Sequence, residues 1–128
     1  MDINEAGALL YWCEGSKREE DYRVELVNSD PRMVSIFMKY LRGKGVEERR
    51  LRIRLSIHVQ DDEEECKAYW KTVTGLRDYH FISPVVKKQS NWRRHLPYGT
   101  ATIRYNSVEL LREVKKEIWV MADCLSQS

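Results

Sequence analysis

Several features of other protein classes are missing from this sequence. No run of about 18 apolar residues occurs, which excludes a helix that crosses a membrane. The first residues, MDINEAGALLYWCEG, have no basic segment before the apolar ones, so we expect no signal peptide. Cysteines are few and odd in number, and no CxxC or HxxxH pair occurs, which argues against a zinc site. We expect Cys13, Cys66 and Cys124 to be reduced core residues of a cytoplasmic protein.

The length and composition fit one ordered domain. The chain has 128 residues, of which 42% are hydrophobic and 33% are charged. It contains no linker or low-complexity tract, so we predict a single domain over residues 1–128. The formal net charge is only +2, but the charges are unevenly distributed. Residues 42–54 carry six basic and two acidic side chains, residues 87–95 carry four basic and no acidic ones, and the run DDEEE occupies residues 61–65.

Hydrophobic periodicity predicts alternating helices and strands. The expected order is helix, strand, helix, strand, helix, strand, strand and helix. This is an α+β fold with helices on one face of a mainly antiparallel sheet. The predicted helices cover about residues 3–14, 31–42, 61–74 and 107–125, and the predicted strands about residues 22–28, 50–59, 81–87 and 100–106. The residues of the two later helices that we expect in the core include Cys66, Trp70, Leu111, Val114, Ile118, Trp119, Met121 and Leu125.

The segment RLRIRLSIHV, residues 50–59, has the clearest strand pattern. Its apolar residues alternate with Arg50, Arg52, Arg54, Ser56 and His58. A period of two predicts one buried and one solvated face. The arginines lie about 7 Å apart along such a strand, and their planar guanidinium groups suit both phosphate oxygens and the guanine edge. The residues that we expect to extend this basic face from neighbouring strands are Arg23 and Arg104, with Thr100 and Thr102 beside them.

A second basic cluster, KKQSNWRRH at residues 87–95, favours nucleic-acid binding. It has no acidic residue, and Trp92 stands in its middle. Its basic residues, which we expect to hold phosphates, are Lys87, Lys88, Arg93 and Arg94. His58, at the end of the basic strand, is a candidate phosphate contact, and the alternatives are a proton carrier or an ordinary solvated histidine. The alternative is a solvated strand face whose arginines provide solubility and pair with acids such as Glu25.

The first predicted helix ends in GALLYWCEG, residues 7–15, which resembles a LAGLIDADG motif. The segment is mostly apolar, its next-to-last residue is the acid Glu14, and it closes with Gly15. The following YRVELVNSDPRMVSIFMKYLRGKG is similar to the strand and helix that follow the motif in LAGLIDADG homing endonucleases. The motif also resembles a YWxEGxK variant of small prokaryotic LAGLIDADG-like proteins. The resemblance covers about the first 60 residues, and YGTATIRYNSVELLREV fits the closing strand and helix more loosely.

The resemblance implies a homodimer that binds double-stranded DNA on a saddle-shaped sheet. Two motif helices would pack side by side at a twofold axis through Leu9, Leu10 and Cys13. Each helix would place Glu14 over a scissile phosphate, where Glu14 and Gly15 would hold a divalent ion such as Mg²⁺. Such an ion stabilises developing charge and lowers the pKa of an attacking water, so the implied activity is metal-dependent DNA cleavage.

The sequence also departs from the family pattern. Leu9 stands where tight helix pairing calls for a small residue, and Trp12 stands where the family usually has its first acid. Only six residues separate Gly15 from Tyr22, so the DNA-facing hairpin is shortened or lost. Three functions therefore stay open: a DNA endonuclease acting through Glu14, a DNA-binding regulator without cleavage, and a protein-interaction domain whose arginines meet an acidic partner. For Glu14 the simplest alternative is an ordinary polar helix end.

Overall fold

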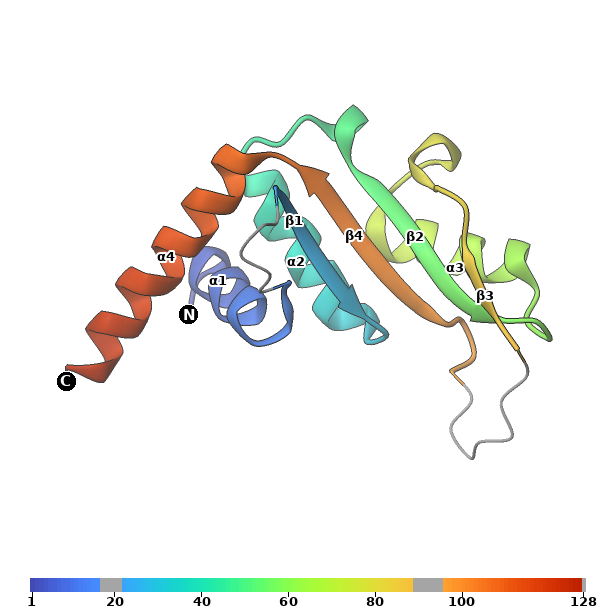
Figure 1. The fold of residues 1–128 in the computed structure, drawn as a ribbon, viewed down its shortest axis with the longest axis horizontal. Coiled ribbons are helices and arrows are strands. Elements are labelled where there is room, and N and C mark those ends of the chain that lie inside the picture. The colour runs from blue at the N-terminus through green and yellow to red at the C-terminus, as the bar shows by residue number, and fades with distance from the viewer. Residues whose placement is uncertain (17–21, 89–95, 128) are drawn as a thin grey trace.

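The computed structural model describes residues 1–16, 22–88 and 96–127, and Figure 1 shows their α+β arrangement. The helices in these ranges are α1 (Ile3–Glu14), α2 (Pro31–Gly43), α3 (Glu63–Thr74) and α4 (Val108–Ser126). The strands are β1 (Arg23–Asn28), β2 (Arg52–His58), β3 (Val85–Lys87) and β4 (Thr100–Asn106), and two short 3₁₀ turns are η1 (Glu48–Arg50) and η2 (Asp78–His80). The predicted order of helices and strands is confirmed. Two strands are shorter than predicted: β2 begins two residues later, after η1, and β3 begins at Val85.

All four described helices begin after a residue with a short polar side chain. A side-chain oxygen of Asp2, Asp30, Asp62 or Ser107 accepts a hydrogen bond from a backbone N–H of the first helical turn. These caps satisfy donors that have no partner inside the helix, so they fix where each helix starts. The acidic run at residues 63–65 lies in the first turn of α3, where the helix dipole favours negative charge.

The four strands form one sheet in the order β1-β4-β2-β3. β4 lies between β1 and β2 and is antiparallel to both, whereas β3 is parallel to β2. The sheet is therefore mixed. The antiparallel arrangement that we predicted holds for β1, β4 and β2, but not for β3. The parallel pair has a physical reason: α3 connects β2 to β3, and a helical crossover returns the chain in the same direction.

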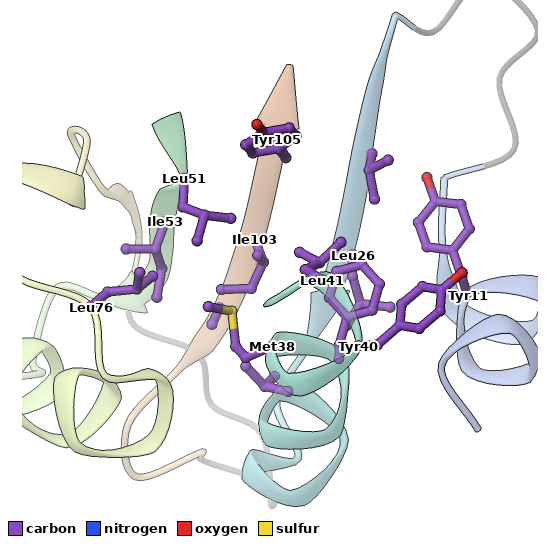
Figure 2. Packing of buried hydrophobic residues seen from close by; sticks show 14 of the residues in the cluster. Tyr11, Leu26, Met38, Tyr40, Leu41, Leu51, Ile53, Leu76, Ile103 and Tyr105 are labelled. Carbon is purple, nitrogen blue, oxygen red and sulfur yellow. The ribbon is translucent and has the colours of Figure 1, made fainter. Parts of the chain in front are cut away.

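The core lies between one face of the sheet and the helices, as Figure 2 shows. Alternate strand residues are buried there, among them Leu26, Ile53 and Ile103. They meet α2, whose Met38 and Leu41 are also fully buried. The alternation predicted for residues 50–59 is confirmed over residues 51–58, where each odd-numbered residue is buried and each even-numbered one is partly exposed. Val59, which we predicted on the buried face, is 64% exposed because β2 ends at His58.

Helix α1 packs closely on α2 through its small residues. Gly7 and Ala8 are buried, and a Cβ atom added at Gly7 would lie less than 3.0 Å from carbons of Tyr40. At the end of α1, a Cβ added at Gly15 would meet the ring of Tyr11 equally closely. The Tyr11 ring in turn stacks on Phe37 of α2, with centroids 5.8 Å apart. Both glycines of the motif are therefore required by packing.

Several residues that we predicted in the core lie on the surface. Trp119 is 63% exposed and Leu125 is 65% exposed, because the second half of α4 extends away from the sheet (Figure 1). Cys13 and Cys124 are also exposed, whereas Cys66 and Trp70 are buried as predicted. Across the described residues, no helix combines the length and the apolar content needed to cross a membrane.

Candidate nucleic-acid interface

The side of the sheet opposite the core, which we call the open face, is lined by polar and charged side chains. The described helices leave it uncovered (Figure 1). Because neighbouring strand residues point to opposite faces, the alternation that buries the core residues also creates this surface. The open face comprises Arg23, Glu25 and Val27 of β1, Thr100, Thr102 and Arg104 of β4, and Arg52, Arg54, Ser56 and His58 of β2.

The strand register arranges these side chains in rows across the sheet. One row contains Glu25, Arg104 and Arg52, which are Cα partners on β1, β4 and β2. The next row contains Val27, Thr102 and Arg54 in the same order of strands. Neighbouring strands lie about 4.8 Å apart, so the members of one row can reach the same short segment of a ligand.

The first row is partly neutralised by Glu25. Arg104 donates from Nε to Oε2 of Glu25 at 2.7 Å, and Nη1 of Arg23 lies 3.8 Å from the same oxygen. The cross-strand pairing that we considered as the alternative to DNA binding is therefore present at this position. Among the described residues of the open face, Glu25 is the one carboxylate, so the basic charge of the face exceeds its acidic charge.

Arg52 and Arg54 of β2 differ in how their guanidinium groups are held. Nη1 of Arg52 donates to the backbone carbonyls of Arg49 and Leu51, at 2.7 Å each. Arg54, by contrast, forms no hydrogen bond or ion pair within the described part of the chain, and its buried Nε has no acceptor. Arg54 is thus the arginine of the open face whose guanidinium group has no existing contact to break, and a ligand would have to bind its terminal nitrogens because Nε is buried.

Arg50, which we predicted on the basic strand, lies in η1 instead. Its guanidinium group stacks on the Tyr105 ring, with its carbon 4.6 Å from the ring centroid, and donates to the carbonyl of Asn106. Tyr105 belongs to the buried side of β4. The structure therefore separates Arg50 from the open face and places it at the end of β4.

The basic residues near β3 extend the open face toward the sheet edge. His58 and Lys87 are Cα partners, and Nδ1 of His58 lies 3.2 Å from the carbonyl oxygen of Lys88. The side chains of Lys87 and Lys88 are exposed. The other two predicted phosphate-binding residues, Arg93 and Arg94, lie outside the described residues.

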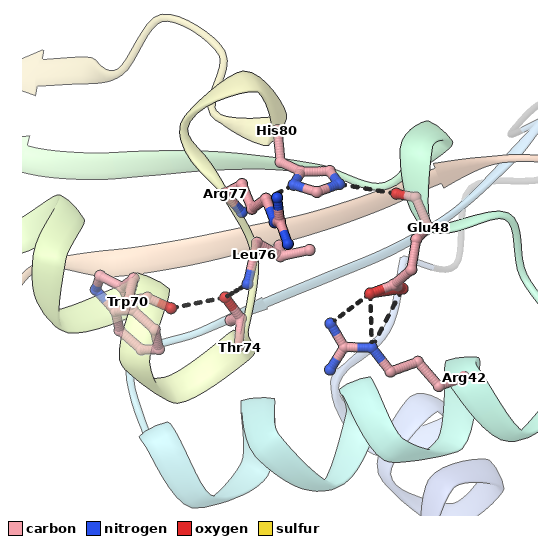
Figure 3. Close-up of polar contacts among 7 residues, drawn as sticks. All are labelled: Arg42, Glu48, Trp70, Thr74, Leu76, Arg77 and His80. Atoms are coloured by element: carbon pink, nitrogen blue, oxygen red, sulfur yellow. Dashed lines mark hydrogen bonds and ion pairs between the residues drawn. The ribbon is translucent and has the colours of Figure 1, made fainter.

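A polar network holds the turn that leads into β2 (Figure 3). Glu48 of η1 accepts hydrogen bonds from Nε and Nη2 of Arg42 on α2, at 2.8–3.2 Å. Its carbonyl oxygen lies 2.8 Å from Nε2 of buried His80, while Nδ1 of His80 accepts from the backbone N–H of Arg77. The His80 proton therefore belongs on Nε2. These contacts fix the entry of β2 and so the position of its arginines.

Glu14 lies at the last position of α1, and its side chain is exposed. After it, Gly15 forms an isolated antiparallel bridge with Leu26 of β1, and the N–H of Ser16 donates to the carbonyl of Glu25 at 3.0 Å. This pairing places Glu14 beside the β1 edge of the sheet. The carboxylate is a suitable oxygen ligand for a hard cation, but one such group does not complete a metal site.

Helix α1 presents an apolar surface on the side opposite its buried residues. Leu9 is partly exposed and Cys13 is exposed, whereas Leu10 is partly buried against the core, so two of the three predicted interface residues lie on this outer side. Leu9 also lines a groove of about 810 Å³ between α1 and α4, where Val120 and Leu125 form part of the other wall. The described part of the chain therefore has an uncovered apolar strip next to the motif.

Comparison of the sequence and structure with protein-family models, curated proteins and solved structures gave no match. Within the described residues, no three His, Cys, Asp or Glu side chains gather in a group able to hold a metal ion. The functional conclusion therefore rests on the chemistry of the open face and of α1.

Proposed function

We propose that this protein binds double-stranded DNA on the open face of its sheet, as a LAGLIDADG-like homodimer. One observation carries the proposal: Arg23, Arg52, Arg54 and Arg104 come from three adjacent strands and lie on a single uncovered face. Basic side chains neutralise phosphates, and strands as well as helices can enter a groove of DNA. Glu25 is the only described carboxylate among them, so the face as a whole favours a polyanion.

The arrangement around α1 supports the LAGLIDADG-like part of the proposal. The motif forms a helix that ends at Glu14, and the chain then bridges to β1 through Gly15. The bridge is compatible with a first hairpin that is shortened or lost, and β1 and α2 follow as the resemblance implies. After β2, α3 and β3, the strand β4 and the helix α4 close the chain.

The homodimer would form through the outer side of α1. Leu9 and Cys13, with the partly buried Leu10 beside them, offer an apolar strip that a second copy of the same strip can cover in a twofold arrangement. Such a contact would bring two open faces onto one DNA duplex, and it would place the two Glu14 residues near each other.

Metal-dependent cleavage would use this pair of carboxylates. Glu14 of each copy would hold a divalent ion such as Mg²⁺ together with a DNA phosphate and the Gly15 backbone. The ion would supply charge stabilisation and a more acidic bound water. The second candidate is a DNA-binding regulator, and it is favoured by the packing of Gly7 and Gly15: both glycines are needed by the fold, so their presence does not require catalysis.

The test is a gel-shift titration with duplex DNA, followed by incubation of supercoiled plasmid with Mg²⁺ or Mn²⁺, for wild type and Glu14→Gln. Retardation by both proteins and cleavage by wild type alone would support the endonuclease. Retardation by both without cleavage would support the regulator. If the protein does not bind duplex DNA, the proposal is wrong. It is also wrong if duplex DNA does not displace an acidic protein partner from the open face, because the arginines then serve a protein interaction.

A further inference from the structure

On the basis of the proposed DNA binding, we infer that the row Val27, Thr102 and Arg54 contacts base edges. Arg54 recognises a guanine, and Val27 contacts the methyl group of a neighbouring thymine. The row lies one step along the sheet from the Glu25 row and runs across β1, β4 and β2. Its outer Cα atoms lie about 10 Å apart, which is comparable with the about 12 Å width of a major groove.

The state of the Arg54 guanidinium group supports a role in base reading. Arg104 is paired with Glu25, and Arg52 donates to two backbone carbonyls, so both can add charge but have limited freedom to reorient. Arg54 has no such partner, and its Nε is a buried donor without an acceptor. With Nε buried, the two terminal nitrogens Nη1 and Nη2 remain to donate to a ligand that offers two acceptors in a plane, such as guanine O6 and N7.

The other two residues of the row, Val27 and Thr102, suit an apolar and a polar contact with neighbouring bases. Val27 is 48% exposed although it is apolar, and the alternating pattern of β1 fixes it on the open face. An exposed apolar side chain at a DNA surface can contact the thymine methyl group. Thr102, between the two, is short and adds a hydroxyl that can donate or accept. A row of this composition distinguishes base pairs, whereas a row of lysines would contact only phosphates.

The experiment begins with selection of preferred sites from a random duplex library, for wild type, Arg54→Lys and Arg32→Lys. Lysine keeps the positive charge but loses the planar pair of donors. We expect Arg54→Lys to lose the preference for guanine at one position of each half-site, by about tenfold, while the salt dependence of binding is unchanged. Arg32→Lys, the matched control on α2 and away from the open face, should keep the wild-type preference.

The thymine contact is tested on the selected site by replacing single thymines with deoxyuridine, which lacks the methyl group. Wild type should lose affinity several-fold at one position, and Val27→Ser should be insensitive to the same replacement. If wild type binds duplex DNA but neither variant alters the preference, the row does not read bases, and the proposed function stands. If wild type binds no duplex DNA, both the proposed function and this inference are overturned. Unchanged melting temperatures would show that the variants are folded.

Discussion

Glu25 and Arg104 form an ion pair across β1 and β4, with Arg104 Nε 2.7 Å from Oε2 of Glu25. The pair places a negative charge inside a surface that is otherwise basic. It both fixes the direction of Arg104 and weakens the attraction of the open face for a polyanion. We therefore expect Glu25 to lower the affinity of the protein for DNA.

The substitution Glu25→Gln tests this relationship. It removes the negative charge and frees Arg104, so we expect duplex DNA to bind about three- to tenfold more tightly, with a steeper salt dependence. The ion pair is partly solvated, and its loss should lower the free energy of unfolding by no more than about 1 kcal/mol. The control is Asp78→Asn, which breaks the ion pairs with Lys67 and Lys71 of α3, away from the open face. Equal effects of both variants on DNA affinity would contradict the prediction.

The close packing of α1 on α2 predicts opposite effects of one substitution at two glycines. Gly7→Ala would place a Cβ against Tyr40, and overpacking of this kind costs about 1–3 kcal/mol. Gly43→Ala, at the end of α2, meets no atom within 4 Å and should be neutral or stabilise by up to about 1 kcal/mol through the unfolded state. Urea denaturation measures both. Equal stability of the two variants would show that α1 does not pack against Tyr40 as described.

The hydroxyl of Tyr40 predicts how stability changes at high pH. It donates to Oε2 of Glu117 at 3.3 Å, and burial together with the negative charge of Glu117 raises the pKa of Tyr40 well above its usual value. The unfolded chain loses this proton near pH 10, but the folded chain keeps it. The stabilisation is therefore complete below about pH 10 and declines above it, by up to about 1.4 kcal/mol per pH unit.

Urea denaturation of wild type and Tyr40→Phe between pH 8 and pH 11 isolates this contribution, because other titrating groups are common to both proteins. The difference in unfolding free energy between wild type and variant should be constant at first and then fall as the pH rises above 10. A difference that stays constant through pH 11 would mean that Tyr40 ionises normally in the folded protein.

The proposed dimer predicts that one charge on α1 separates the two copies. Leu9→Glu introduces a carboxylate into the apolar strip, so sedimentation should show a monomer where wild type is a dimer. Because two half-sites would no longer be bound together, DNA affinity should fall as well. Trp119→Ser is the control: Trp119 is exposed on α4 but does not line the groove beside Leu9. Dissociation by Trp119→Ser and not by Leu9→Glu would place the interface elsewhere.

Much of the fold could be predicted because local rules determine it. The order of helices and strands follows from hydrophobic periodicity, and the helix starts follow from Asp2, Asp30, Asp62 and Ser107. The alternation in β2 alone places Arg52, Arg54 and the buried residues on opposite faces. The mistakes occur where position in the whole molecule matters: Trp119 and Leu125 continue a helical pattern, but α4 has left the sheet by that point.

The sequence by itself determined that one strand face would be basic, because a side-chain period of two is a property of any extended chain. Only the tertiary structure decided what each arginine does, since this depends on the register between strands that are distant in sequence. That register places Glu25 beside Arg104 and Thr102 beside Arg54. The 3₁₀ turn before β2 removes Arg50 from the face. Long-range pairing of backbone groups therefore distinguishes Arg104, which Glu25 neutralises, from Arg54, which has no partner in the described part of the chain. No local sequence pattern contains that information.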